Sequence, residues 1–329
     1  MKAQVLRQYG PEAHFELTDI PEPQIRPGHV ILHVKATSLN PLDSKIRRLG
    51  LPLAPDLPAV LHGDVAGIVK EVGEGVTGIQ VGDAVYGCAG GVKGHGGALA
   101  EYMVVDAQLI APKPRSLDFL QAAALPLVSL TAWEGLIDRA HVQPEQTVLI
   151  HGAAGGVGHI ALQIAVIKDA SVFATISSKE KGDLGSRLGA KEVIYYREES
   201  PEAYVKRLTK GKGFDIVFDT VGGPNIDQSF LAAANHGQVI TIVSMSSHDL
   251  TPMHLRGLTL HVVFQPLPLL TGKGRAHHGH ILRQIARWVD EGKLTPLVDP
   301  IHFTLKDVNA AHEYFESGKH KGKIVIEVS

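Results

Sequence analysis

Cysteine is nearly absent from the sequence: Cys88 is the single one among 329 residues. One cysteine excludes an intramolecular disulfide and any zinc site that needs two thiolates from the same chain. An excess of one charge is also lacking, because 32 Lys and Arg stand against 34 Asp and Glu. Nothing in this balance favours a polyanion, so we expect a small-molecule substrate and no nucleic-acid partner.

Long apolar runs are missing as well. The longest near-apolar run, residues 122–133, is interrupted by Pro126 and is shorter than the ~20 residues that a membrane helix needs. Residues 1–13 alternate charged, polar and small side chains, so no secretory signal is expected. The default prediction is a cytoplasmic protein without a membrane partner.

Glycine, in contrast, is abundant, at 35 of the 329 residues. Its densest stretches are residues 63–97, 152–158 and 211–223. Many glycines without low-complexity sequence indicate tight turns and close backbone approaches, as in a β-rich or α/β enzyme. A chain of this length also predicts two domains, at ~100–200 residues per domain.

Short strand-like segments fill the first third of the chain. They recur about every ten residues, a spacing typical of a compact β domain or barrel. These segments are residues 30–36, 66–72, 81–87 and 98–105. Two helical segments follow, at residues 117–124 and 130–140.

From residue 147 the pattern changes to strands that alternate with helices, which predicts βαβ units and a parallel, doubly wound sheet. The last strand, residues 323–328, cannot join a sheet that is already complete, so we assign it to the N-terminal β domain. The predicted fold class is α/β. We expect a β-rich domain of residues 1–122 and 268–329, a doubly wound domain of residues 123–267, and an active site in the cleft between them.

A glycine triplet follows the apolar strand 148–150. Gly152, Gly155 and Gly158 form a G-x-x-G-x-x-G pattern before a helix. A Cβ atom there would block the tight turn and keep a pyrophosphate away from the N–H groups at the helix N-terminus. An ordinary strand–helix turn is the alternative, but the βαβ context favours a Rossmann dinucleotide site. The predicted contacts are Gly152, Ala153, Gly155, Gly156 and Val157.

The end of the next strand indicates which dinucleotide binds. Sites for NAD place an acidic residue there, about 20 residues past the glycine loop. Here the strand is followed by Ser177, Ser178 and Lys179, with Lys181 two residues later. Small donors and lysines suit the 2′-phosphate of NADPH, which is the predicted cofactor. The lysines also fit a solvated helix start, and an inward-pointing Glu180 would repel a phosphate.

Several stretches resemble the quinone oxidoreductase (zeta-crystallin-like) branch of the medium-chain dehydrogenase/reductase superfamily. They are spread over nearly the whole chain and are specific only together. They are residues 38–43 (SLNPLD), 63–69 (GDVAGIV), 81–86 (VGDAVY), 97–102 (GALAEY), 126–132 (PLVSLTA) and the glycine loop. The resemblance implies a GroES-like catalytic domain beside the Rossmann domain, a homodimer or homotetramer, and hydride transfer from NADPH to a quinone or an activated C=C bond.

Positions within the family pattern imply further site residues. Lys181 and Tyr196 resemble contacts to the 2′-phosphate, although Tyr196 also fits an exposed aromatic at a strand end. Asn40 and Thr131 resemble residues near the nicotinamide and its ribose. The remaining predicted cofactor contacts are Thr220, Ser244 and Phe264, of which the last two lie on segments that usually line the nicotinamide end.

No metal site is expected. Related alcohol dehydrogenases carry cysteines in the regions that here read Leu42-Asp43 and residues 127–129, and the four-cysteine lobe is missing too. An alternative is a non-standard site, for which ligand spacing alone is weak support. Its candidate ligands are His62, Asp64, Cys88 and His95. The histidines of residues 277–280 are predicted in a loop before a helix, as a solvated run.

Without a Lewis acid, the site must act on acceptors that take a hydride readily, such as quinones and α,β-unsaturated carbonyls. Asp43 is the one named acid/base candidate, with a capping carboxylate as an equally good interpretation and water as the other proton source. Lys45 stands where many relatives carry a tyrosine, which predicts an acceptor with an anionic group. The catalytic candidates are thus Asn40, Asp43, Lys45 and Thr131.

Other functions remain compatible with these patterns, because a fold does not dictate a function. They are a zinc-type alcohol dehydrogenase relative, an enoyl-thioester reductase, and an NADPH-binding sensor or structural protein with little turnover. Oxidation of NADPH by a panel of acceptors distinguishes turnover from binding alone.

Overall fold

The computed structural model describes residues 1–329, apart from the side chains of Glu180 and Lys181. The chain forms two compact units: unit 1 consists of Met1–Leu127 and Pro266–Ser329, and unit 2 of Val128–Gln265. The sequence placed these junctions at 122/123 and 267/268. Among the described residues, no helix combines the length and apolar content that crossing a membrane requires.

Unit 2 is built on a six-stranded sheet of parallel strands in the order β10-β9-β8-β11-β12-β13. The chain starts in the middle, moves to one edge, and returns to build the other half. This is the doubly wound sheet that the alternation of strands and helices predicts. The strands are β8 (Thr147–His151), β9 (Ser171–Ile176), β10 (Glu192–Tyr195), β11 (Phe214–Asp219), β12 (Ala233–Thr241) and β13 (Thr259–Val262).

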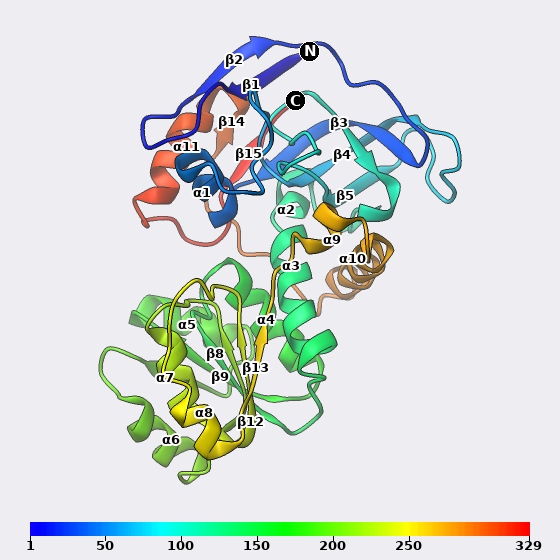
Figure 1. The fold of residues 1–329 in the computed structure, drawn as a ribbon. Helices are drawn as coiled ribbons and strands as arrows, with labels where there is room; N and C mark the ends of the chain where they lie inside the picture. The colour runs from blue at the N-terminus through cyan, green and yellow to red at the C-terminus, as the bar shows by residue number, and fades with distance from the viewer. The chain divides into compact units, whose positions relative to one another are not determined.

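Helices connect these strands and pack on the sheet (Figure 1). In α4 every residue from 158 to 165 is buried. This part of the helix therefore has no face exposed to solvent and no amphipathic pattern. An aromatic core contains Phe173 and Phe214, with ring centroids 5.2 Å apart. The helices are α4 (Gly156–Ile167), α5 (Lys179–Arg187), α6 (Pro201–Thr209), α7 (Asn225–Ala232) and α8 (Thr251–Arg256).

Unit 1 is the β-rich unit. Its main sheet has seven strands, with the path β14-β15-β3-β4-β5-β7 and β6 paired to β3, while β1 and β2 form a two-stranded sheet. Val30, Leu32 and Val34, at alternating positions of β3, belong to its apolar core. The strands are β1 (Lys2–Leu6), β2 (Phe15–Asp19), β3 (His29–Ser38), β4 (Asp64–Val72), β5 (Ala84–Cys88), β6 (Tyr102–Asp106), β7 (Ile110–Pro112), β14 (Phe303–Thr304) and β15 (Val325–Glu327).

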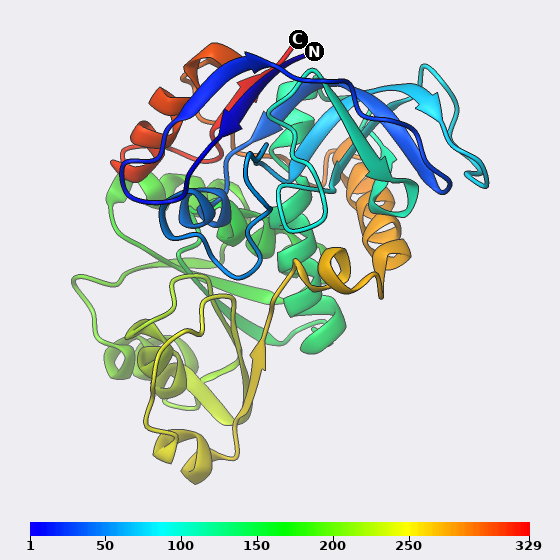
Figure 2. The ribbon, with the colours of Figure 1, turned by 45° about the horizontal axis from the view of Figure 1, so that its top comes forward.

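The C-terminal segment completes the sheet of unit 1. Strand β15 pairs antiparallel with β3, with Val325 opposite Ser38, and parallel with β14. The two chain termini lie side by side (Figures 1 and 2), and residues from both ends line one surface pocket. The helices of this unit are α1 (Pro41–Leu49), α2 (Phe119–Ala123), α9 (Leu267–Thr271), α10 (Arg275–Asp290) and α11 (Val308–Glu316).

Two helices begin earlier than the sequence predicts. Helix α3 (Pro126–Trp133) begins at Pro126 rather than at residue 130, because a proline in the first turn sacrifices no helical hydrogen bond. Helix α10 begins at Arg275, so the histidines of residues 277–280 lie in a helix and not in a loop, and His278 is buried. Gly274, at φ 90°, precedes the first turn and allows this early start.

Candidate active-site residues

The predicted dinucleotide residues of unit 2 follow the carboxyl ends of its strands. Because the strands are parallel, these ends share one edge of the sheet, where ligands of doubly wound folds bind. The strand order reverses between β8 and β11, so the glycine loop after β8 lies at the topological switch point. Gly152 follows β8, Ser177 follows β9, Tyr196 follows β10, Thr220 follows β11, and Ser244 and Phe264 come shortly after β12 and β13.

The glycine loop makes a tight turn from β8 into α4. Gly152 has φ 69°, the left-handed region that favours glycine, and the Gly155 N–H donates to the Gly152 carbonyl at 2.9 Å. Gly155 is the N-cap of α4 and provides no side chain to cap it. The first N–H groups of the helix therefore lack an intrahelical acceptor and are oriented to bind an anion.

Side chains are excluded from the inner face of this loop. A Cβ atom on Gly158 would lie 2.2 Å from the Gly152 carbonyl oxygen and 2.8 Å from Ala153 Cα. One on Gly152 would lie 2.6 Å from the Thr220 hydroxyl, which itself donates to the His151 carbonyl at 2.7 Å. Gly155, Gly156 and Val157 remain partly or fully exposed. The loop thus has the bare backbone that fits a pyrophosphate.

The ends of β9 and β10 carry hydroxyl groups and a cation. Ser177 is half-buried and Ser178 is exposed, and no carboxylate lies between Ile176 and Lys179. The Tyr196 N–H donates to the Ile176 carbonyl at 3.4 Å, which brings Tyr196 beside the end of β9. The Tyr196 ring is 50% exposed, and the Arg197 guanidinium lies 5.8 Å from its centroid.

Lys181, predicted to bind the 2′-phosphate, lies outside the described side chains, as does Glu180. Arg197 is a cation that the sequence analysis did not single out. The signal that points to it is its position directly after Tyr196 at a strand end, where an arginine can stack on the ring and remain solvated.

Behind the loop, buried polar groups hold the strand ends in place. Asp219 accepts from the N–H groups of Val221 and Gly222 at 2.8 and 3.0 Å. His151 Nδ1 lies 3.0 Å from the Thr175 hydroxyl, and burial lowers the pKa of His151 to about 4. His151 is therefore neutral at pH 7 and adds no positive charge behind the loop.

The remaining predicted residues of unit 2 differ in exposure. Ser244 is exposed and Phe264 is 45% exposed, whereas Thr131 in α3 is buried at 4%. Ser244 and Phe264 are therefore accessible to a ligand at this edge, and their assignment as cofactor contacts stays a prediction.

In unit 1, the predicted residue Asn40 belongs to a buried polar cluster. Its Nδ2 donates to Asp64 Oδ2 at 2.8 Å, and its Oδ1 accepts a hydrogen bond from Lys323 Nζ. Asp64 also accepts from the Ser38 hydroxyl at 2.7 Å and, through Oδ1, from the Leu127 N–H at 2.8 Å. The Asn40 side chain is 1% exposed, so its amide is bound at both ends within unit 1.

Asp43 and Lys45 lie on opposite faces of α1. Asp43 is buried, and its Oδ2 accepts from the Asn40 N–H at 2.8 Å, which caps the first turn of the helix. Burial raises the pKa of Asp43 to about 7; the Asn40 N–H opposes the shift, nearby Asp64 adds to it, and Lys323 opposes it. Lys45 is exposed. The contact with the Asn40 N–H is the one expected of a capping carboxylate, and the acid/base role of Asp43 stays a prediction.

The four candidate ligands of the alternative metal site do not come together as one group among the described residues. In the part of the chain whose side chains are described, no three His, Cys, Asp or Glu residues come together to hold a metal. His62 Nε2 lies 3.0 Å from His312 Nε2 with both rings buried, and burial lowers the pKa of each. Asp64 is bound by the donors described above, and His95 lies 3.2 Å from the Arg275 guanidinium.

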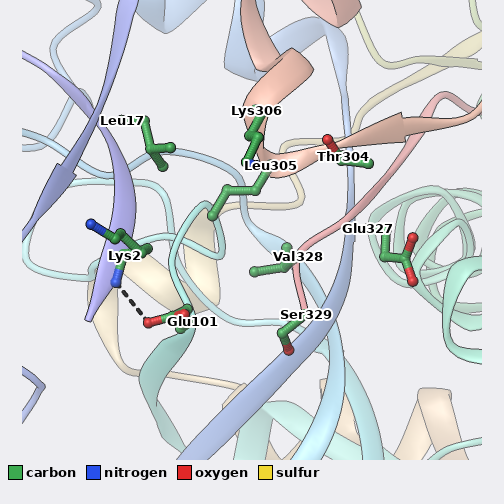
Figure 3. A pocket seen from close by; sticks show the side chains of 9 residues that line it. All are labelled: Lys2, Leu17, Glu101, Thr304, Leu305, Lys306, Glu327, Val328 and Ser329. Carbon is green, nitrogen blue, oxygen red and sulfur yellow. Dashed lines mark hydrogen bonds between the residues drawn. The ribbon is translucent and has the colours of Figure 1, made fainter.

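Unit 1 also has a surface pocket of about 350 Å³ beside the chain termini (Figure 3). Its charged lining includes Lys2 and Lys306 together with Glu101 and Glu327, and the Lys2 N–H donates to Glu101 at 2.7 Å. None of the predicted catalytic or cofactor residues lines it. The mixture of charges selects no ligand class.

Comparison with known proteins gives a consistent result. Residues 26–115 match the family described as alcohol dehydrogenase GroES-like domain, and residues 188–326 match zinc-binding dehydrogenase. The NADPH-dependent alkenal/one oxidoreductase (chloroplastic) of Arabidopsis thaliana is 33% identical over 99% of this chain and 79% of its own length. The quinone oxidoreductase of Sus scrofa is 28% identical over 96% of this chain and 94% of its own.

A solved structure agrees over the full length. The crystal structure of an alcohol dehydrogenase superfamily protein from Novosphingobium aromaticivorans superposes with a TM-score of 0.96 and 40% identity, and covers 100% of both chains. The β-rich unit and the parallel sheet confirm the predicted fold class. The chain belongs to the medium-chain dehydrogenase/reductase superfamily, on its quinone and alkenal oxidoreductase side, and it is an oxidoreductase of the kind that uses a nicotinamide cofactor.

Proposed function

We propose that the protein is an NADPH-dependent, zinc-independent oxidoreductase whose acceptor is a quinone or an α,β-unsaturated carbonyl compound. The observation that carries this proposal is the edge of the unit 2 sheet. There a bare glycine loop is followed by Ser177 and Ser178 rather than by a carboxylate, with Arg197 stacked near Tyr196. Hydroxyl groups and a cation favour the 2′-phosphate that distinguishes NADPH from NADH.

The choice of acceptor follows from the absence of a metal-ligand set among the described residues. A simple ketone needs polarisation by a Lewis acid, whereas quinones and conjugated carbonyls accept a hydride without it. Bound NADPH would supply the hydride from C4 of its nicotinamide. One hydride and one proton together convert a quinone to a quinol, or an enone to the saturated carbonyl compound.

The protein's part is to bind, orient and supply the proton. The glycine loop would hold the pyrophosphate on backbone N–H groups. Asp43, with a pKa of about 7, would be protonated in part of the molecules at neutral pH and would act as general acid. Lys45, exposed on the face of α1 opposite Asp43, would favour acceptors that carry an anionic group away from the reacting carbon.

The direct test is NADPH oxidation by purified protein with a panel of quinones, enones, enoyl thioesters, aldehydes and ketones. We expect turnover with quinones or enones, none with simple ketones, preference for NADPH over NADH, and no loss after chelation. NADPH binding without oxidation by any acceptor would instead identify a sensor. Zinc at one ion per chain that survives chelator treatment would contradict the metal-free mechanism.

Arg197→Gln is expected to weaken NADPH binding about tenfold and to leave NADH binding unchanged, because an exposed charge-assisted bond to the 2′-phosphate contributes roughly 1.5 kcal/mol. The dissociation constants of both nucleotides are measured by calorimetry without an acceptor. Arg187→Gln is the matched control, since Arg187 is an exposed arginine at the other end of α5. An equal loss for both nucleotides would exclude Arg197 from phosphate recognition.

We also propose a homodimer or homotetramer that forms through strand β13. In the described sheet β13 is an edge strand paired to β12 alone, and Val262 is 45% exposed on it. Unpaired strand edges pair readily with a second copy. Val262→Lys is expected to give monomers in sedimentation analysis, whereas Val81→Lys, at an exposed valine of unit 1, keeps the oligomer. An unchanged mass for Val262→Lys would place the interface elsewhere.

A further inference from the structure

Unit 1 buries a lysine and an aspartate next to each other. The side chain of Lys323 is 4% exposed and that of Asp64 0%, and Lys323 Nζ lies 3.6 Å from Asp64 Oδ2. Charges are buried at this depth only when paired and hydrogen-bonded. Both are: Lys323 Nζ also donates to the Leu39 carbonyl at 2.9 Å, and Asp64 accepts the hydrogen bonds of Ser38, Asn40 and Leu127 described above.

The pair holds the Asn40 carboxamide from both ends. Lys323 donates to its oxygen while Asp64 accepts from its nitrogen, so the amide has one orientation. Asn40 precedes α1, and its backbone N–H donates to the Asp43 carboxylate at 2.8 Å. The position of Asp43 therefore depends on Asn40 and on the two charged residues that hold the Asn40 carboxamide.

The same two charges act on Asp43 from different elements. Asp64 begins β4, and Lys323 precedes β15. Two other titratable or charged groups lie near. Arg47, on the same helix as Asp43, forms an ion pair at 2.7 Å with Glu316 of α11. Cys88 of β5 lies opposite Asp64 in the sheet register. Of these groups, Asp64 and Lys323 are the charged residues that shift the pKa of Asp43, in opposite directions.

We propose that Lys323 and Asp64 are positioning residues for the proton-donating step: their buried ion pair fixes Asn40 and, through it, the place and charge environment of Asp43. This inference rests on the proposed function in naming Asp43 as the proton donor. The hydrogen bonds and the burial carry it. The pH profile of kcat separates this role from a purely structural ion pair, because a structural pair would leave the high-pH limb of that profile unmoved.

The test is the titration of the Asp43 carboxyl by carbon-13 NMR in the cofactor-free protein, with Asp43→Asn identifying the signal. Lys323→Met removes a cation and is expected to raise the titration midpoint by roughly 0.5–1 pH unit, whereas Asp64→Asn removes an anion and lowers it by a similar amount. Lys323→Arg keeps the charge and stays near wild type. Lys319→Met is the matched control, because Lys319 is exposed.

Should Lys323→Met fail to fold because Asp64 is left unpaired, the double variant Asp64→Asn/Lys323→Met is compared with Asp64→Asn alone. The double variant leaves neither Asp64 nor Lys323 as an unpaired buried charge. Its titration midpoint must lie above that of Asp64→Asn. Midpoints that move in the same direction, or do not move, would overturn the proposal.

Kinetics separate this inference from the proposed function. The high-pH limb of the kcat profile is expected to move with the NMR midpoint in each variant. If no acceptor oxidises NADPH, the proposed function fails, while opposite NMR shifts still support the positioning of Asp43. If turnover is normal and the shifts are absent, the inference alone fails.

Discussion

Gly158→Ala is expected to weaken dinucleotide binding by about 100-fold or more. The added Cβ would lie 2.2 Å from the Gly152 carbonyl oxygen and 2.8 Å from Ala153 Cα, which are backbone atoms that cannot rotate away. The loop must shift, and the N–H groups at the start of α4 lose their alignment. Loss of two charge-assisted hydrogen bonds, at roughly 1.5–3 kcal/mol each, gives this magnitude.

Calorimetric titration with NADPH and thermal unfolding measure the two effects of this substitution. Gly155→Ala serves as the companion variant, because its Cβ would meet a single atom at 3.2 Å and its backbone is extended. We expect Gly155→Ala to preserve the melting temperature and to reduce binding less. Wild-type affinity in Gly158→Ala would show that the pyrophosphate does not depend on this turn.

Asp43→Asn is expected to lower kcat about 100-fold, the usual contribution of a positioned general acid, and to remove the high-pH limb of the rate profile near pH 7. The amide preserves the acceptor for the Asn40 N–H, so the cap on α1 is retained. The profile of kcat from pH 5 to 9 is the measurement. A wild-type rate in this variant would assign the proton to water.

The same substitution should change stability in one direction. The pKa of the Asp43 carboxyl is 3.8 in the unfolded chain, and burial raises it to about 7 in the folded protein. Between these two pH values the unfolded chain therefore releases a proton that the folded protein keeps. Wild-type stability therefore falls as pH rises through this window, by up to about 1.4 kcal/mol per unit. Asp43→Asn lacks this loss and is expected to be the more stable protein at pH 8, with no advantage at pH 4. Urea midpoints at both pH values test the sign.

The sequence was sufficient for the features that depend on local pattern. Strand–helix alternation after residue 147 predicted the parallel sheet, and the glycine triplet predicted the turn at its switch point, because both patterns follow from neighbours in the chain. The family resemblance and the fold class are confirmed. The roles of Asn40, Thr131 and the cofactor contacts stay predictions.

The buried ion pair shows what local pattern cannot reveal. Lys323 and Asn40 are 283 residues apart, and their contact depends on how β15 returns to β3. The sequence carries a faint signal, since Asp64 directly precedes the apolar residues 65–66 and Lys323, the last of three nearby lysines, directly precedes the apolar residues 324–326. An unpaired charge at the start of a buried strand would be costly. Which charge meets which is decided by sheet register.

The place of β15 in the sheet has a consequence for synthesis. Unit 2 is one continuous stretch and has all its strands once residue 265 has left the ribosome. Unit 1 lacks the strand between β14 and β3 until residues 323–329 have followed. Domains fold as their chains emerge, so the β-rich half is expected to be an unfinished sheet until residues 323–329 have been made. A nascent chain halted at residue 322 would lack both its last strand and the lysine that fixes Asn40.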